Sequence, residues 1–214
     1  MYLHGSIALG DFNPGESDVD FLVVTERDID AEQIGKLDAL HLRLGAWLDG
    51  SYLPREVFRR FDPARVMHPH IESRGGRLFV DHHGGETIIY RYVLRKCGVV
   101  LVGPPPQDLV DPVDREELRA AVRDLVANWW VPMLDEASRF DDAAYRRYMV
   151  LTMCRVRFTL AERDVVSKPK AACWALGHVE REWRPLIERA AVHGDCDYDE
   201  TVAFVRSTLA AASC

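Results

Sequence analysis

Two carboxylates separated by one residue lead directly into an apolar segment, and this junction restricts the fold more than any other feature of the chain. Asp18 and Asp20 stand in Ser17-Asp18-Val19-Asp20, which continues as Phe21-Leu22-Val23-Val24. The apolar run predicts a strand, and side chains on a strand alternate between its two faces. Both carboxylates are therefore expected to point to the same side of a sheet.

A Gly-Ser pair precedes these carboxylates in His4-Gly5-Ser6. Gly5 lets backbone N–H groups approach a phosphate, and Ser6 offers a hydroxyl group. Mg²⁺ prefers oxygen ligands and is usually shared between one or two carboxylates and the phosphates of a substrate. Asp-x-Asp alone is common on solvated strand edges and in turns, but the Gly-Ser pair favours a Mg²⁺ site held by Asp18 and Asp20.

The first half of the chain alternates short apolar segments with helical patterns, which is typical of an α/β sheet domain. Asp30 and Gln33 form a capping box ahead of a helix whose apolar face is expected to hold Ile34, Leu37, Leu40 and Leu44. Strands are expected over Tyr2–His4, Val19–Thr25, Trp47–Leu53, Leu78–Val80 and Val99–Val102.

The character of the chain changes at Gly103-Pro104-Pro105-Pro106. Prolines remove backbone donors and enforce an extended connector, so we place a domain boundary here, with domains at 1–105 and 106–214. Beyond it, apolar residues recur at helical spacing in several successive segments, which predicts an antiparallel helical bundle.

Two histidine-containing segments resemble metal sites at first sight. His82-His83 follows Asp81, but adjacent side chains on an extended segment point in opposite directions, which favours a surface turn. Met67-His68-Pro69-His70 has ligand-like spacing but no nearby Cys or Glu, and we interpret it as a loop.

Composition narrows the class of protein. The chain has 214 residues, of which 48% are hydrophobic, and is long enough to bury a sizeable core. Its formal charge of −7 argues against nucleic-acid partners and is compatible with a cationic small substrate. The 5 cysteines are scattered, which indicates reduced thiols and a cytoplasmic protein. The sequence has neither a long apolar run nor a signal-peptide pattern, so no membrane association is expected.

The N-terminal motif, Gly5-Ser6 followed by Ser17-Asp18-x-Asp20, resembles that of the polymerase-beta-type nucleotidyltransferase superfamily. The second half resembles the helical domain of aminoglycoside adenylyltransferases of the streptomycin/spectinomycin type. This likeness implies an α/β nucleotidyltransferase domain, with a mixed sheet and flanking helices, followed by an all-α helical bundle domain. The segments that carry it are Val100–Pro104, Leu109–Val113, Leu151–Arg155, Ala171–Ala175 and Pro185–Ile187.

The resemblance implies transfer of AMP from ATP, with Mg²⁺ and release of pyrophosphate, to a hydroxyl group of a small molecule such as an aminoglycoside. Asp18 and Asp20 are then expected to hold the metal, and Gly5, Ser6 and Ser17 to bind the nucleotide. ATP and a small hydroxylated acceptor are the expected partners, and the sequence leaves the oligomeric state open.

A third carboxylate is expected on the neighbouring strand, and Asp49 in Ala46–Tyr52 is the candidate. A charge in a short apolar segment is costly unless it serves a site. The alternative is that Asp49 lies in a turn with Gly50. By resemblance, the carboxylate at this place accepts the proton of the substrate hydroxyl, so we expect Asp49 to be a general base and also a metal ligand.

The leaving pyrophosphate needs positive charge. Lys168 follows Ser167, which is expected to cap a helix, and a helix N-terminus favours anions. By resemblance, a basic residue of the helical domain reaches the phosphates, which makes Lys168 a candidate for binding the nucleotide. The alternative is a solvated surface lysine.

The chain departs from the family in two places. One is that only Met1–His4 precede the Gly-Ser turn, where the family has a helix and part of a strand, and this departure bears on the completeness of the sheet. The other is that the acidic residues that grip the cationic drug are replaced by Pro169 and Cys173, and this departure bears on the acceptor. A different hydroxylated metabolite is therefore an alternative to an aminoglycoside. Two other functions stay open: nucleotidylation of a protein or tRNA, as in toxin-like enzymes, and nucleotide binding without catalysis.

Overall fold

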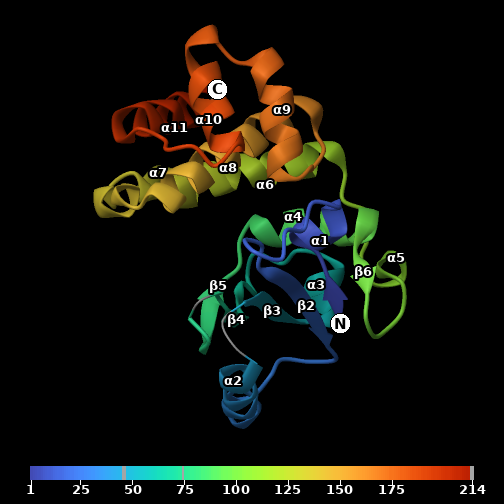
Figure 1. The fold of residues 1–214 in the computed structure, drawn as a ribbon. Helices are drawn as coiled ribbons and strands as arrows, with labels where there is room; N and C mark the ends of the chain where they lie inside the picture. The colour runs from blue at the N-terminus through green and yellow to red at the C-terminus, as the bar shows by residue number, and fades with distance from the viewer. Residues whose placement is uncertain (45–46, 74, 213–214) are drawn as a thin grey trace. The chain divides into compact units, whose positions relative to one another are not determined.

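The computed structural model of the protein describes residues 1–44, 47–73 and 75–212. The chain divides into two compact units, Met1–Val113 and Asp114–Cys214 (Figure 1). The boundary predicted between residues 105 and 106 lies just before helix α5 (Pro106–Leu109), which belongs to the first unit.

The first unit is built on a six-stranded mixed sheet in the order β5-β4-β3-β2-β1-β6. Strands β2 and β3 are parallel, and every other neighbouring pair in this order is antiparallel. This confirms the predicted mixed sheet. The strands are β1 (Tyr2–Leu3), β2 (Val19–Thr25), β3 (Leu48–Pro54), β4 (Met67–Ile71), β5 (Leu78–His82) and β6 (Val99–Val100).

The strand predictions are correct in place and differ in extent. Val19–Thr25 is confirmed residue for residue, whereas the strand expected to reach Val102 ends at Val100. Of the strand expected at Trp47–Leu53, Trp47 lies before β3, which runs from Leu48 to Pro54. Ala46, which begins the segment named for Asp49, lies outside the described residues. The interpretation of Met67–His70 as a loop is wrong, because this segment forms β4 between β3 and β5.

The helices of the first unit are α1 (Gly5–Leu9), α2 (Ala31–Leu44), α3 (Arg55–Arg59), α4 (Glu86–Cys97) and α5. The predicted capping box at the start of α2 is confirmed, because Gln33 N–H donates to Asp30 Oδ1 at 2.9 Å and Asp30 N–H donates to Gln33 Oε1 at 3.0 Å. The apolar face predicted for α2 is only half right. Ile34 and Leu37 pack against the sheet, but Leu40 and Leu44 are 43% and 58% exposed.

A buried histidine takes the place of the outer leucines of α2. His41 Nε2 lies 2.8 Å from the hydroxyl oxygen of Tyr52, and its ring stacks on Phe21. A polar ring can therefore pack against the sheet here, because a partner satisfies one of its nitrogens.

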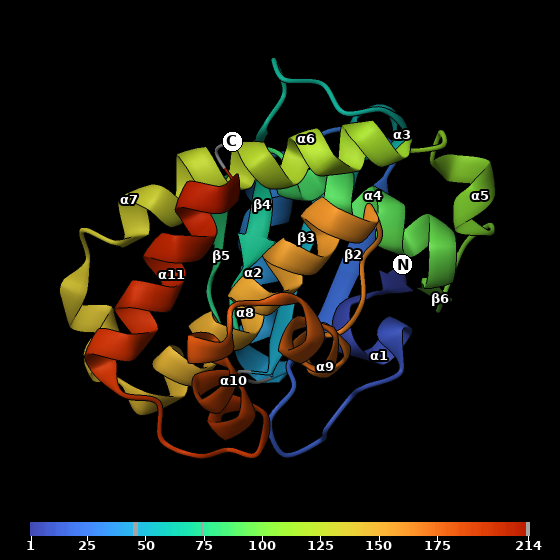
Figure 2. The ribbon, with the colours of Figure 1, turned by 90° about the horizontal axis from the view of Figure 1, so that it is seen from above.

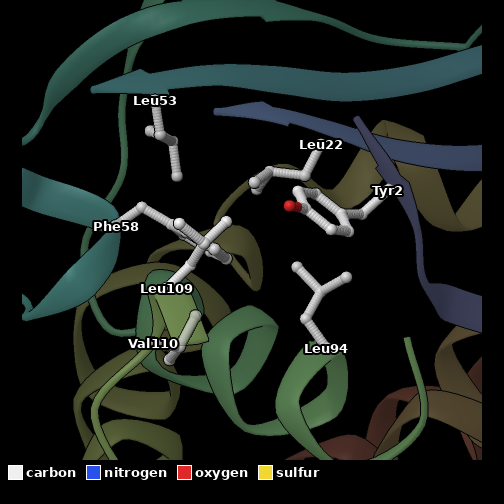
Figure 3. Packing of buried hydrophobic residues seen from close by; sticks show 7 residues of the cluster. All are labelled: Tyr2, Leu22, Leu53, Phe58, Leu94, Leu109 and Val110. Carbon is white, nitrogen blue, oxygen red and sulfur yellow. The ribbon is translucent and has the colours of Figure 1, made fainter. Parts of the chain in front are cut away.

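Alternation along the strands separates two hydrophobic clusters, one on each face of the sheet. Phe21 faces the cluster beneath α2, whereas its neighbour Leu22 faces the opposite cluster. That second cluster is covered by α3, α4 and α5. Figure 3 shows its side chains packed together: Tyr2, Leu22, Leu53, Phe58, Leu94, Leu109 and Val110.

The second unit is helical throughout, as predicted for the bundle. Helix α8 (Ala143–Glu162) is its centre and packs against α6 (Arg115–Leu125), α9 (Lys168–His178), α10 (Arg184–Ala191) and α11 (Tyr198–Ala212) (Figure 2). Asp114 and Asp142 cap α6 and α8 by accepting backbone N–H groups of the first turns. A π-helical turn at Val126–Trp130 and the short α7 (Val131–Met133) follow α6.

The described helices include none long and apolar enough to cross a membrane. Four of the cysteines, Cys97, Cys154, Cys173 and Cys196, are free thiols, and Cys214 lies outside the described residues.

Leu22→Ala tests the packing of the sheet. Leu22 has 0% exposure, whereas Leu42 on α2 is 55% exposed. We expect Leu22→Ala to lower the free energy of unfolding by about 2–5 kcal/mol, because it leaves a cavity among packed side chains. Urea denaturation followed by circular dichroism measures this. Leu42→Ala is the matched control and should change stability little; equal losses in both variants would contradict the packing described.

Candidate active site

The parallel pairing of β2 with β3 places Asp20 directly opposite Asp49. The pairing begins with Val19 N–H, which donates to the carbonyl oxygen of Trp47 at 2.8 Å. Asp49 thus lies within a strand, as predicted, rather than in a turn with Gly50. Residues far apart in the sequence are brought together at one end of two adjacent strands.

The Gly-Ser turn lies against Asp20. His4 N–H donates to the carbonyl oxygen of Asp20 at 3.0 Å, and α1 begins at Gly5. Gly5 has φ +54°, and a Cβ at this residue would lie 1.8 Å from Asp20 Oδ2. Only glycine therefore fits here, because the carboxylate of Asp20 occupies the space of any side chain.

Two buried oxygens beside this turn have no hydrogen-bond partner in the part of the chain that the structure describes. They are the hydroxyl oxygen of Ser6 and Oδ1 of Asp18. Buried polar atoms without a partner are uncommon in folded proteins, and each one suggests strain, an ion or a ligand. A cation for Asp18 and a phosphate oxygen for Ser6 are partners of the right chemistry.

Ser73 links two of the carboxylates. Its hydroxyl donates to Asp18 Oδ2 at 2.8 Å, and its backbone N–H donates to Asp49 Oδ2 at 3.4 Å. The residues predicted for the site do not include Ser73, because it lies after a strand that the sequence pattern failed to indicate. No motif or spacing in the sequence points to it.

The crowding of negative charge changes the acidity of Asp49. Burial is the largest cause that raises the pKa of this carboxyl to about 7. The charges of Asp20, Asp18 and Glu72 contribute in the same direction, while the N–H of Ser73 acts in the opposite direction. A carboxyl with such a pKa is poised to take up a proton near neutral pH.

The residues fit a divalent cation that arrives with phosphate oxygens. Across residues 1–44, 47–73 and 75–212, no group of three or more His, Cys, Asp and Glu side chains is assembled as a metal site by itself. Mg²⁺ requires less, since one or two carboxylates and the oxygens of a bound triphosphate suffice. The unpaired Oδ1 of Asp18 and the adjacent Asp20 provide such oxygen donors.

Two further residues are predicted to bind the nucleotide, Ser17 in the first unit and Lys168 in the second. The Ser17 hydroxyl oxygen accepts the N–H of Asn13 at 3.0 Å and so closes the turn that enters β2. Lys168 is the first residue of α9 in the second unit, where Ser167 holds the N-cap position as predicted. The Lys168 ammonium lies 4.0 Å from the centre of the Tyr148 ring, and its contact with the phosphates stays a prediction.

Comparison with known proteins agrees with this geometry. Residues 1–57 match the family described as a nucleotidyltransferase domain, and residues 108–211 match the C-terminal domain of aminoglycoside adenylyltransferase. The resemblance stated from the sequence is thereby confirmed in both halves.

Individual proteins that the chain resembles are adenylyltransferases. The aminoglycoside (3'') (9) adenylyltransferase of Klebsiella pneumoniae is 30% identical over 96 residues, which are 45% of this chain and 34% of that protein. The match thus spans about a third of that relative. The spectinomycin 9-adenylyltransferase of Campylobacter jejuni is 21% identical over 204 residues, covering 89% of this chain and 75% of that protein.

A solved structure shows the same fold. It is the spectinomycin adenyltransferase AAD(9) from Enterococcus faecialis with ATP and spectinomycin, which has a TM-score of 0.74. The alignment covers 98% of this chain and 90% of that one at 14% identity, which establishes likeness of fold.

Histidines of the first unit form a buried network around Ser51, on the strand that carries Asp49. The Ser51 hydroxyl oxygen lies 3.0 Å from His70 Nδ1 and 2.7 Å from His83 Nε2, and His83 Nδ1 lies 3.1 Å from the carbonyl oxygen of Asp81. The expectation of a surface turn at His82-His83 is wrong for His83, which is 4% exposed. Burial lowers the pKa of His83 to about 4 and also lowers the pKa of His70. The network is therefore neutral at pH 7 and joins β3, β4 and the end of β5.

Asp49→Asn is expected to stabilise the protein at alkaline pH. Because the pKa of Asp49 is raised to about 7 in the folded state, the folded protein holds a proton that the unfolded chain has released, and stability falls as pH rises from about 4 to 7. The variant removes this loss, which is about 4 kcal/mol at pH 8 for a pKa raised from about 4 to about 7.

Urea denaturation at pH 8 and pH 5, with a chelator present, measures the difference between the two proteins. The gain should shrink as pH falls. The histidines have lowered pKa values and act in the opposite direction, but they are common to both proteins and cancel. A variant less stable than the wild type at pH 8 would contradict the crowding of charge around Asp49.

Proposed function

We propose that the protein transfers AMP from ATP to a hydroxyl group of a small molecule, with Mg²⁺ and release of pyrophosphate. The observation that carries the proposal is the meeting of Asp20 and Asp49 on adjacent strands, against the Gly5-Ser6 turn and beside Asp18. The named relatives are adenylyltransferases, which supports the same reaction class here.

Gly5 and Ser6 have the chemistry to bind phosphate. The close approach of Gly5 to Asp20 puts the turn and the carboxylate side by side, and the buried Ser6 hydroxyl has no partner among the described residues. A triphosphate oxygen would satisfy that hydroxyl, while the repulsion between phosphate and Asp20 requires a cation between them. Asp18 and Asp20 would hold Mg²⁺, which when bound neutralises charge on the attacking and leaving oxygens.

Asp49 is proposed as the general base. It takes the proton of the acceptor hydroxyl as that oxygen bonds to the α-phosphorus, and the bond from the α-phosphorus to the departing pyrophosphate breaks. A pKa of about 7 suits this role, because a base is most effective when its pKa lies near the working pH. In the second unit, Lys168 at the start of α9 is proposed to neutralise charge on the phosphates.

The acceptor is proposed to be a small hydroxylated molecule. The relatives named above carry aminoglycosides and spectinomycin in their names, so a protein or tRNA acceptor and a catalytically silent module are not favoured. Pro169 and Cys173 stand where the resemblance leads us to expect acidic residues. The proposed class of acceptor therefore includes uncharged polyols as well as aminoglycosides. Free cysteines and the use of ATP support a cytoplasmic location.

Pyrophosphate release from Mg²⁺-ATP tests the proposal. The acceptor panel comprises streptomycin, spectinomycin, other aminoglycosides and uncharged polyols, and mass spectrometry detects an acceptor that has gained AMP. We expect Asp49→Asn to lower turnover by about 10²–10⁴-fold, because the hydroxyl loses its base. Asp18→Asn should also lower turnover, because it replaces a carboxylate ligand of Mg²⁺ with an uncharged amide.

The matched control is Asp28→Asn in the same unit. Asp28 is 69% exposed and pairs with Arg65 at 2.7 Å, away from the catalytic carboxylates. This variant should keep wild-type turnover. Full activity in both Asp18→Asn and Asp49→Asn would overturn the proposed function.

A further inference from the structure

Ser73 makes two hydrogen bonds to different carboxylates of the proposed catalytic site. The hydroxyl reaches Asp18 Oδ2 at 2.8 Å, and the backbone N–H reaches Asp49 Oδ2 at 3.4 Å. Asp18 precedes β2 and Asp49 lies in β3, so one residue ties together groups from two segments of the chain. The Ser73 side chain therefore donates its hydrogen bond to Asp18.

The hydrogen bond from Ser73 gives the two carboxylate oxygens of Asp18 different environments. Oδ2 is occupied by the Ser73 hydroxyl, whereas Oδ1 is buried without a partner within the described residues. A side chain held at one oxygen has a fixed rotamer, and the other oxygen then stays at one position. Without the serine hydroxyl, the carboxylate would be free to rotate and to pair elsewhere.

The position of Ser73 is itself fixed by the sheet. Ile71 and His70 at the end of β4 pair with Gly50 and Ser51 of β3, the strand that carries Asp49. The buried contacts of Ser51 with His70 and His83 reinforce this pairing. Ser73 follows after one further residue, so a paired strand supports the donor that holds Asp18.

We propose that Ser73 is a positioning residue for the divalent cation: its hydroxyl holds Asp18 so that Oδ1 stays available as a ligand. This inference rests on the proposed function of the same site. Groups that orient a metal ligand typically change metal affinity by 10–100-fold when they are removed. Ser73 thus sets the affinity for the cation without touching the nucleotide or the acceptor.

Binding of Mn²⁺ to the full chain, followed by electron paramagnetic resonance with a non-hydrolysable ATP analogue present, tests the proposal. We expect Ser73→Ala to weaken Mn²⁺ binding by about 10–100-fold. Ser73→Thr keeps the hydroxyl and should stay close to the wild type. Thr25→Val is the matched control, since it removes a hydroxyl that donates to the carbonyl oxygen of Arg27 at 2.8 Å, at the end of β2 opposite Asp18 and Asp20. It should leave Mn²⁺ binding unchanged.

Turnover gives a second readout. In Ser73→Ala the Mg²⁺ concentration for half-maximal rate should rise, and the rate at saturating Mg²⁺ should return towards the wild-type value. Unchanged Mn²⁺ binding in Ser73→Ala would overturn the proposal. Equal weakening in Ser73→Ala, Ser73→Thr and Thr25→Val would also overturn it, because it would indicate a structural role.

Failure of the proposed function is distinguishable from failure of this inference. A wild-type protein that adenylylates no acceptor, yet loses Mn²⁺ binding in Ser73→Ala alone, would contradict the function and support the positioning role. A wild-type protein that adenylylates an acceptor, together with unchanged Mn²⁺ binding in Ser73→Ala, would support the function and contradict the positioning role. A wild-type protein that binds no Mn²⁺ with the nucleotide analogue would overturn both.

Discussion

The parallel pairing of β2 with β3 brings two carboxylates, Asp20 and Asp49, directly opposite each other, and the rest of the first unit is arranged around this contact. Like charges on adjacent strands destabilise a sheet. The structure accommodates them at the end of the paired region, where Gly5 leaves space for Asp20 and the N–H of Ser73 reaches Asp49. Burial and, after it, repulsion from Asp20 raise the pKa of Asp49. A site that costs stability in this way is typical of function, because the same charges are needed to bind a cation.

Buried histidines pack on both faces of the sheet. His41 pairs with Tyr52 on the face under α2. Alternation along β3 places Ser51 on the same face as Leu53, so its contacts with His70 and His83 lie on the face that also carries the apolar cluster under α3, α4 and α5. The histidine network joins β4 to the strand of Asp49 and so supports the residue that links Asp49 to Asp18. The geometry of the carboxylates thus depends on contacts several residues away from them.

Much of this arrangement could be predicted from local patterns. The strand Val19–Thr25, the capping box at Asp30 and the helical second half follow from apolar periodicity and capping chemistry, which act within a few residues. Strand β4 could not be predicted in this way, because Pro69 and two histidines interrupt the usual composition of a strand. Its pairs with β3 involve His70 and Ile71, so Pro69 lies beyond them and its missing N–H costs that pairing nothing. The role of Ser73 could not be predicted either, because it arises from tertiary contacts across the sheet.

Crystals of the protein grown with Mn²⁺ and a non-hydrolysable ATP analogue would test the central claim most directly, through anomalous scattering at the manganese absorption edge. The account predicts an anomalous peak bonded to the carboxylates of Asp18 and Asp20 and to oxygens of the triphosphate, with the Gly5-Ser6 turn against the phosphates. Bound nucleotide with no metal peak at these two residues, or with the peak at other side chains, would contradict the assignment of the site.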